Sequence, residues 1–305
     1  MSLGSSKEPQ PGMPDTKAKP IIYEPQLTEI LGQGSTSLVA RIRPGLVVKY
    51  PRYMWWHAKS PRDNPFVQDA KRAFEVEAKI LDLLGTHIRI IHYLGISDDP
   101  RGLLFEEATG SHGNLQTYID QHQHHHDITL TLRLEWCLQA AEAIQYIHRK
   151  DVIHSDLRPE NFLLHSDSKE NLNLVLCDFG GSKSDELEID TEHLPDSGFF
   201  NPAWPWVPTK AVDIFSLGSV FYTIMTGHWP YKSPGPFESS KEKYEYEEMV
   251  DDIFSRQKFP PVDELYCGSI TQGCWTERYS DVSVLVQDLA CLLAEMNESN
   301  ERSPI

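Results

Sequence analysis

Alternating apolar and polar residues, many of them β-branched, mark the first third of the chain and predict short strands. A helix is expected over 67–84, where Phe74, Ile80, Leu81 and Leu84 supply the apolar face. The strands are expected at 28–34, 37–43, 46–50, 92–96 and 102–106. The pattern therefore predicts a small unit built from one sheet and one helix.

Helical periodicity dominates the rest of the chain. Apolar residues recur at spacings of three and four over 129–149, which predicts one buried face. The segment 209–226 is more uniformly apolar, as expected of a central buried helix, and Gly227 and Pro230 end it. A last amphipathic helix is expected at 281–296. Composition and periodicity alone predict an α+β protein with a strand-rich part and a helical part.

The composition is that of a globular protein. Of the 305 residues, 40% are apolar and 24% are charged. No apolar run approaches the ~18–20 residues that a membrane-spanning helix requires, so no membrane association is expected. The five cysteines show no paired spacing, which predicts free thiols in a reducing, intracellular compartment. The cytoplasm is expected, and the nucleus is left open as an alternative.

The net charge of −17 argues against nucleic-acid binding, which requires basic patches that displace counterions. It favours neutral or cationic partners, although solubility alone also explains such a charge. Residues 1–20, rich in Pro, Gly, Ser and Lys, are expected to be disordered, and the tail 297–305 to be flexible.

The most informative motif is HSDLRPEN at 154–161, followed by DFG at 178–180. Asp156 precedes Asn161 by five residues and Asp178 by 22. Two metal-binding groups that follow a candidate base in this order are typical of a phosphoryl-transfer site. From about residue 21 to residue 296 the chain resembles a eukaryotic protein kinase, of a divergent serine/threonine type that lacks the arginine before the catalytic aspartate.

The resemblance implies a bilobal kinase fold, with a small N-lobe of antiparallel sheet plus one helix and a larger, mainly helical C-lobe. The N-lobe is expected at 21–107 and the C-lobe at 108–296. The implied cofactors are ATP and Mg²⁺. The implied partner is a protein substrate, and the chain is expected to be a monomer.

Several N-lobe residues match the family's nucleotide site. Gly32 and Gly34 lie in a strand–turn–strand context where backbone N–H groups can approach phosphates, although two glycines in a hairpin more often mean only a turn. Val39 matches the valine that lies over adenine, and Ser37 replaces a third family glycine. Lys49 matches the lysine that contacts the α- and β-phosphates.

Glu77 is the matching acidic partner of Lys49, with Glu75 the weaker candidate. Val47 replaces a family alanine, which should narrow the adenine pocket. The remaining residues implied to line this pocket are Phe105 at its back, Glu106 and Ala108 through their backbone groups, and Leu163 as its floor.

In the catalytic motif, the resemblance implies that Asp156 is the base or orienter for the substrate hydroxyl. Asn161 and Asp178 would hold Mg²⁺, a hard cation that prefers oxygen ligands. Arg158 stands where serine/threonine kinases usually carry a lysine that faces the transferred phosphate. Any one of these residues alone could cap a turn; their order together indicates the site. Asp213 matches a buried aspartate that holds the catalytic-loop backbone.

The first departure from the family is Ser155, in place of the arginine that commonly binds a phosphate on the activation segment. Without that cation, phosphorylation has little to pair with locally. The segment itself is acidic, so added negative charge should repel. These acids are Asp185, Glu186, Glu188, Asp190, Glu192 and Asp196. We therefore expect activity without activation-segment phosphorylation.

The second departure is FFNPAWPW at 199–206, which replaces the usual Ala-Pro-Glu ending and lacks its glutamate. Arg278 matches the arginine that normally pairs with that glutamate. Since a buried unpaired arginine is costly, Arg278 is expected to be exposed or bonded elsewhere. The Trp204–Trp206 cluster is expected to alter the substrate-binding shelf.

Three weaker signals remain. HQHHHD at 122–127 is interpreted as a polar loop rather than a metal site. Cys177 is interpreted as a small buried residue rather than a reactive thiol. The acidic run YEYEEMVDD at 244–252 suggests basic residues near the target hydroxyl, or simply a solvated helix face.

The favoured interpretation is an ATP- and Mg²⁺-dependent protein serine/threonine kinase. One alternative is a pseudokinase scaffold that binds nucleotide or a partner without phosphoryl transfer. The other is phosphorylation of a small molecule on the same fold, which rests on the altered shelf.

Overall fold

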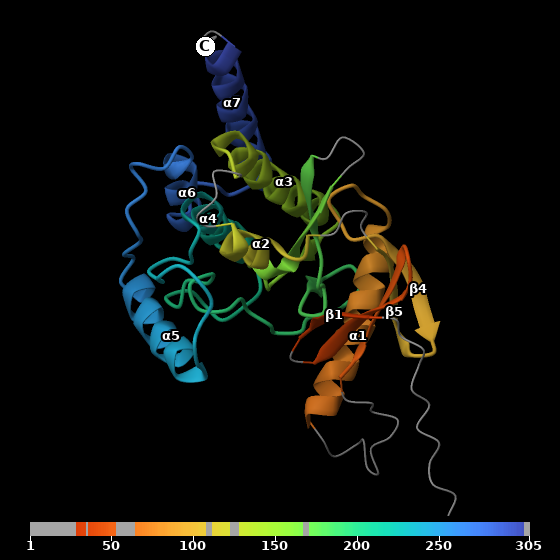
Figure 1. Ribbon diagram of the computed structural model, residues 1–305. Helices are drawn as coiled ribbons and strands as arrows, with labels where there is room; N and C mark the ends of the chain where they lie inside the picture. Colours follow the sequence, from red (N-terminus) through yellow and green to blue (C-terminus); the bar gives the residue numbers. More distant parts are fainter. Residues whose placement is uncertain are drawn as a thin grey trace, which may run out of the picture.

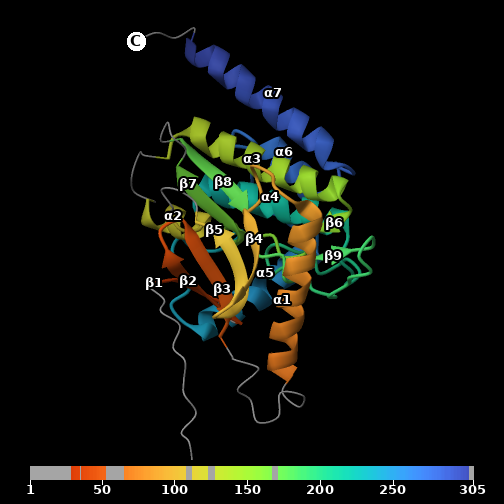
Figure 2. The same cartoon turned by 90° about the vertical axis from the view of Figure 1, so that its right-hand side faces the viewer.

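The computed structural model describes residues 29–34, 36–52, 65–107, 112–122, 128–166 and 171–301. A five-stranded antiparallel sheet and one helix form its smaller part (Figures 1 and 2). The strand order is β1-β2-β3-β5-β4. The elements are β1 (Glu29–Gln33), β2 (Ser37–Arg43), β3 (Leu46–Pro51), α1 (Pro65–Leu84), β4 (Tyr93–Asp98) and β5 (Arg101–Glu106).

The larger part is mainly helical. Its helices are α2 (Leu115–Gln121), α3 (Leu130–Arg149), α4 (Lys210–Thr226), α5 (Ser240–Ser255), α6 (Gly268–Trp275) and α7 (Val282–Glu301). Two short antiparallel pairs lie between them in the chain: β6 (Val152–Ile153) with β9 (Lys183–Ser184), and β7 (Phe162–Ser166) with β8 (Leu172–Leu176). The predicted α+β arrangement of a small strand-rich lobe and a larger helical lobe is thus confirmed.

Helix α4 is the centre of the larger lobe. Most of its side chains are buried, and it packs against α3 and α6. The Thr209 hydroxyl accepts a hydrogen bond from the N–H of Val212 and caps the start of the helix. Gly227 ends it with φ at +87°, a left-handed conformation that favours glycine. The predicted central buried helix is therefore present.

The structure differs from the expected elements mainly where apolar periodicity is weak. Helix α5 buries only Tyr246, Val250 and Phe254 among charged residues, and α2 and α6 are short. Helices α2 and α6 were not predicted, and α5 was anticipated only in the interpretation of 244–252 as a solvated helix face. Helix α7 continues to Glu301, beyond the expected end at 296, so the first residues of the predicted tail are helical.

The lobe boundary expected at 107/108 falls between β5 and α2 and stays a prediction. No helix in the described part of the chain combines the length and apolar character needed to cross a membrane. Residues 1–20 and Ala108 lie outside the described residues, as does 123–127 of the histidine-rich tract.

Candidate active site

A largely buried lysine on β3, with 12% of its side chain exposed, joins two carboxylates from different parts of the chain. The Nζ of Lys49 lies 2.7 Å from Oε2 of Glu77 on α1 and 2.8 Å from Oδ1 of Asp178. Glu77 is 2% exposed, whereas Glu75 is an exposed residue that pairs with Lys71 along the same helix. The structure thus places Glu77, not Glu75, against Lys49.

Burial and charge act in opposite directions on this cluster. Burial by itself would lower the pKa of Lys49, but Asp178 and Glu77 outweigh it and raise that pKa. Burial also opposes ionisation of Asp178, yet the Lys49 ammonium holds the pKa of that carboxyl below its usual value. Lys49 and Asp178 therefore form an ion pair at neutral pH.

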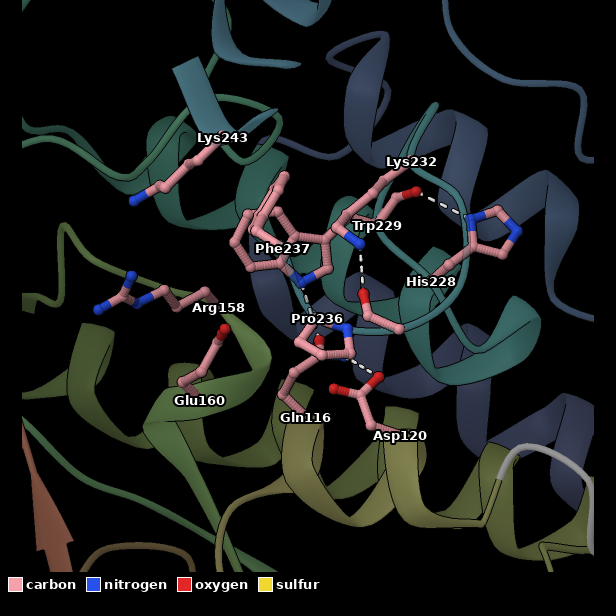
Figure 3. A pocket seen from close by; sticks show the side chains of 11 residues that line it. Gln116, Asp120, Arg158, Glu160, His228, Trp229, Lys232, Pro236, Phe237 and Lys243 are labelled. Atoms are coloured by element: carbon pink, nitrogen blue, oxygen red, sulfur yellow. Dashed lines mark hydrogen bonds between the residues drawn. The ribbon is translucent and has the colours of Figure 1, made fainter. Parts of the chain in front are cut away.

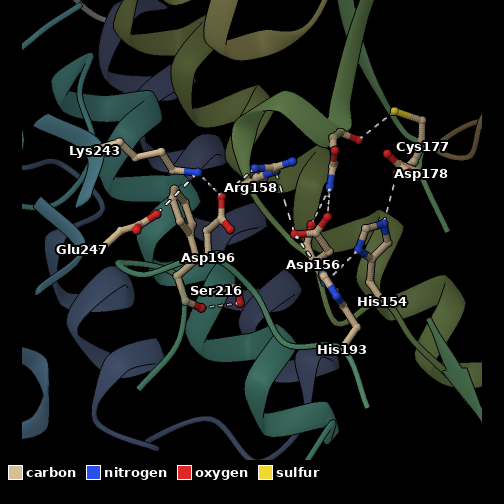
Figure 4. Close-up of polar contacts among 12 residues, drawn as sticks. His154, Asp156, Arg158, Cys177, Asp178, His193, Asp196, Ser216, Lys243 and Glu247 are labelled. Atoms are coloured by element: carbon tan, nitrogen blue, oxygen red, sulfur yellow. Dashed lines mark hydrogen bonds and ion pairs between the residues drawn. The ribbon is translucent and has the colours of Figure 1, made fainter. Parts of the chain in front are cut away.

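The catalytic-loop motif folds so that Asn161 holds Asp156. The Nδ2 of Asn161 donates to the backbone carbonyl of Asp156 at 2.6 Å and to its Oδ2 at 3.1 Å. The N–H of Cys177 donates to the carbonyl of Asn161 at 2.9 Å, which ties the start of the DFG segment to the same loop. Residues 49, 156, 161 and 178 are therefore gathered by a continuous chain of contacts. Figure 4 shows Asp156 and Asp178 of this group.

Asp213 on α4 fixes the backbone that carries Asp156. Its carboxylate is fully buried and accepts from the N–H of His154 at 2.9 Å and of Ser155 at 3.0 Å. The Nε2 of His148 lies 2.8 Å from the same carboxylate. Ser155 has φ at +64°, an unusual conformation for a side-chain-bearing residue. The predicted role of Asp213 in holding this loop is confirmed by these bonds.

The residues predicted to hold Mg²⁺ suit a hard cation. The amide nitrogen of Asn161 is used toward Asp156, so its oxygen is the atom left for a metal. The side chain of Asp178 is 46% exposed, so part of it stays accessible. The described residues contain no group of three or more His, Cys, Asp or Glu that could hold a metal. Mg²⁺ is usually bound by one or two carboxylates together with substrate phosphates and water.

The residues implied to contact the nucleotide lie on neighbouring strands. Val39 is opposite both Gly32 and Lys49 in the sheet register, and Val47 is opposite Phe105. Backbone hydrogen bonds hold two of the other residues: the Gly34 N–H donates to the Ser37 carbonyl at 2.8 Å, and the Glu106 N–H donates to the His92 carbonyl at 3.0 Å. Leu163 is half-buried on β7. Their roles toward adenine and phosphate stay predictions.

Arg158 is engaged by two carboxylates, one in the catalytic loop and one in the activation segment. Its Nη1 lies 2.7 Å from Oδ2 of Asp196 in the activation segment, and its Nε lies 3.8 Å from Oδ1 of Asp156. Lys243 on α5 lies 3.6 Å from the same Asp196 oxygen. Asp196 therefore bridges a catalytic-loop cation and an α5 cation (Figure 4). The sequence showed the acidity of this segment but not which acid reaches the loop.

The altered segment ending is accommodated as predicted. Arg278 is 53% exposed and donates to the Tyr279 hydroxyl at 2.6 Å and to Asp288 at 3.3 Å. Trp204 packs edge-on against Phe215, whereas the Trp206 side chain is 75% exposed. Arg278 thus stays solvated and paired without the missing glutamate.

Cys177 behaves as a structural residue. Its Sγ donates to the Asn161 carbonyl at 3.3 Å, and burial raises the pKa of the thiol above its usual value. A thiolate is the reactive form, so this environment disfavours reactivity.

His193 is a residue that motif comparison missed. Its Nε2 lies 3.8 Å from Oδ1 of Asp156, and this nearby carboxylate raises the pKa of the imidazole above its ordinary value. Only the sequence position of His193, inside the segment after DFG, hinted at a place near the site.

A cavity of about 200 Å³ adjoins the catalytic loop (Figure 3). Its walls include Trp229 and Phe237, with Asp120 of α2 and Glu160 of the catalytic motif among its polar residues. Burial raises the pKa of Glu160, and its Oε2 has no hydrogen-bond partner among the described residues. Arg158, Lys232 and Lys243 also line the cavity, so it carries charges of both signs beside its apolar walls.

Comparison with known proteins identifies similar chains. The protein kinase domain family matches residues 26–302. A calcium/calmodulin-dependent protein kinase, cmkA of Emericella nidulans, is 35% identical over 165 residues, which cover 50% of this chain and 37% of the relative. The serine/threonine-protein kinase 33 of Mus musculus is 27% identical over 213 residues, 66% of this chain and 42% of that protein. The chain spans less than half the length of these relatives.

Proposed function

We propose that this chain, which belongs to the protein kinase family, transfers the γ-phosphate of ATP to serine or threonine hydroxyls of protein substrates. The observation that carries the proposal is the ion-paired Lys49, held 2.7 Å from Glu77 and 2.8 Å from Asp178. An active protein kinase requires this pairing together with a DFG aspartate. The relatives that are named serine/threonine kinases support the choice of acceptor.

Each side chain has a definite task in this proposal. Bound Mg²⁺–ATP would supply the phosphoryl group and neutralise its charge, with Asn161 and Asp178 as the metal-holding residues. Lys49, kept protonated by its two carboxylates, binds phosphate oxygens, and Glu77 orients it. Asn161 engages Oδ2 of Asp156, so Oδ1 is the oxygen that can orient the substrate hydroxyl or accept its proton, in competition with Arg158 and His193 at 3.8 Å.

We further propose that activity does not require a phosphate on the activation segment. Asp196 already bridges Arg158 at 2.7 Å and Lys243 at 3.6 Å. The Ser197 hydroxyl also donates to Asp251 on α5 at 2.9 Å. Such contacts between the segment, the catalytic loop and α5 are what a bound phosphate would otherwise supply. Phosphatase-treated protein should keep its activity, and a large loss after treatment would refute this part.

A preference for basic residues near the target hydroxyl is a further part of the proposal, and it rests on the acidic residues of α5. Some of these acids are already paired, Glu247 with Lys243 and Asp252 with Arg256. The cavity adds no support, because Arg158, Lys232 and Lys243 line it together with Asp120 and Glu160. A peptide array without enrichment of Lys or Arg would contradict the preference.

The test is transfer of radiolabelled phosphate from ATP to generic protein substrates. Asp156→Asn and Lys49→Met should each lose about 10²–10³-fold in rate or more, the usual effect of removing one transition-state contact. Asp151→Asn and Lys71→Met are matched controls, because both residues form only half-exposed ion pairs, with Lys210 and Glu75.

Equal activity in all four variants and the wild type would refute the assignment. Nucleotide binding without any transfer by the wild type would instead favour the pseudokinase alternative. The intact contacts of Lys49 are the reason we prefer the active kinase.

A further inference from the structure

The activation segment places His193 on the open side of Asp156. Because Asn161 engages Oδ2 of Asp156, the remaining oxygen, Oδ1, is the one available to a substrate hydroxyl. The Nε2 of His193 lies 3.8 Å from that same Oδ1, and the ring is directed at the carboxylate (Figure 4). A substrate hydroxyl must therefore share or displace this position.

Local contacts hold the histidine in place. The Thr191 hydroxyl donates to the Gly181 carbonyl at 2.5 Å, and the His193 N–H donates to the Thr191 hydroxyl at 3.3 Å. A Cβ on Gly181 would lie 2.7 Å from the His193 ring, closer than a real contact allows. The ring is thus seated directly on the glycine that follows DFG.

The turn that carries His193 is also attached from outside. Lys183 lies 3.0 Å from the Asp190 carboxylate. Arg72 of α1 donates to the Asp190 carbonyl at 2.6 Å. Glu192, next to His193, has φ at +56°. A left-handed conformation of this kind is maintained only when surrounding contacts favour it. The turn 190–193 is therefore held by both lobes.

The charges around the ring favour its protonated form. Asp156 and Arg158 face it from the catalytic loop, and Asp196 faces it from its own segment. Arg72 of α1 donates to the carbonyl of Asp190, three residues before His193 in the chain. The contact with Asp156 is the largest effect, and together with Asp196 it outweighs burial and Arg158, so the pKa of His193 is raised above its ordinary value.

We propose that His193 is a built-in inhibitory contact, in which the protonated ring covers Asp156 and competes with the substrate hydroxyl. The inference rests on the proposed kinase function and adds a regulatory property to that site. The folded-state pKa is raised, so the contact is fully formed at acidic pH and is lost as pH rises through that pKa. Affinity for the protein substrate should therefore increase over the same interval.

The kinetic test measures KM for a protein substrate at about pH 6 and about pH 8, on either side of the usual histidine range. The wild-type KM should be about two- to fivefold higher at the lower pH, the size expected of a partly exposed ion pair. His193→Gln should remove this difference, while His193→Lys should keep the KM high at both values. Glu192→Gln, a change to the exposed neighbour, should preserve the wild-type profile.

An unchanged pH dependence of KM in His193→Gln would overturn the proposal, as would a low KM for His193→Lys. A second measurement does not depend on catalysis: titration of His193 by NMR in the full chain, wild type beside Asp156→Asn. The histidine pKa should fall in the variant, and an equal pKa in both proteins would overturn the inference. If no phosphate is transferred but the pKa falls, the proposed function fails while the contact itself is confirmed.

Discussion

Replacing Asp213 with Asn tests how the active-site loop is held. The carboxylate of Asp213 is fully buried, and its two oxygens accept from the N–H groups of His154 and Ser155 at 2.9 and 3.0 Å. An asparagine side chain has the same shape but only one accepting oxygen. One of the two buried N–H groups would then face an amide nitrogen and lose its partner.

The expected cost follows from these contacts. A hydrogen bond to a charged group contributes roughly 1.5–3 kcal/mol. The left-handed backbone of Ser155 is present in both proteins, so it does not add to this cost. We therefore expect the free energy of unfolding to fall by about 1.5–3 kcal/mol. At ~2–4 °C per kcal/mol for domains near this size, Tm should fall by roughly 3–12 °C.

The assay compares thermal unfolding and kcat of Asp213→Asn with those of Asp151→Asn. Asp151 carries a half-exposed ion pair to Lys210, which contributes about 0–1 kcal/mol. In Asp213→Asn, kcat should fall more than the affinity for ATP, because Asp156 is displaced while Lys49 keeps its partners. A Tm and a kcat within error of the control would refute the view that Asp213 positions the loop.

Two other substitutions test packing and charge. Arg278→Ala should lower the free energy of unfolding by no more than about 1 kcal/mol in denaturant titrations, because the arginine is 53% exposed; a loss of several kcal/mol would show a buried role. Gly218→Ala should destabilise by about 1–3 kcal/mol in the same titrations, because the added Cβ would lie 2.8 Å from Cβ of Cys274 where α4 meets α6. Unchanged or increased stability of Gly218→Ala would contradict the packing argument.

The elements with strong apolar periodicity could be predicted from the sequence. Helices α3 and α4 begin one residue after their predicted starts, because Thr129 and Thr209 act as caps rather than first-turn residues. Helix α5 has one narrow apolar stripe, and its neighbours are charged. Only tertiary packing of that stripe distinguishes it from a polar loop.

The same limit applies to the site. Lys49, Asp156 and Asp178 lie in motifs whose order along the chain is informative, so their convergence could be anticipated. The contacts of His193 and Asp196 could not be anticipated. They depend on a segment of irregular backbone with a left-handed residue at Glu192. No periodic pattern encodes the path of such a segment.

The central claim is that Lys49, Asn161 and Asp178 together bind a metal-bound nucleotide. Calorimetric titration of the wild-type chain with ATP, with and without Mg²⁺, measures this most directly, beside Asp178→Asn. We predict binding that strengthens when Mg²⁺ is present, and loss of that metal dependence in the variant. The account would be contradicted if the wild-type chain bound no nucleotide. It would also be contradicted if both the wild type and Asp178→Asn bound ATP as strongly without Mg²⁺ as with it.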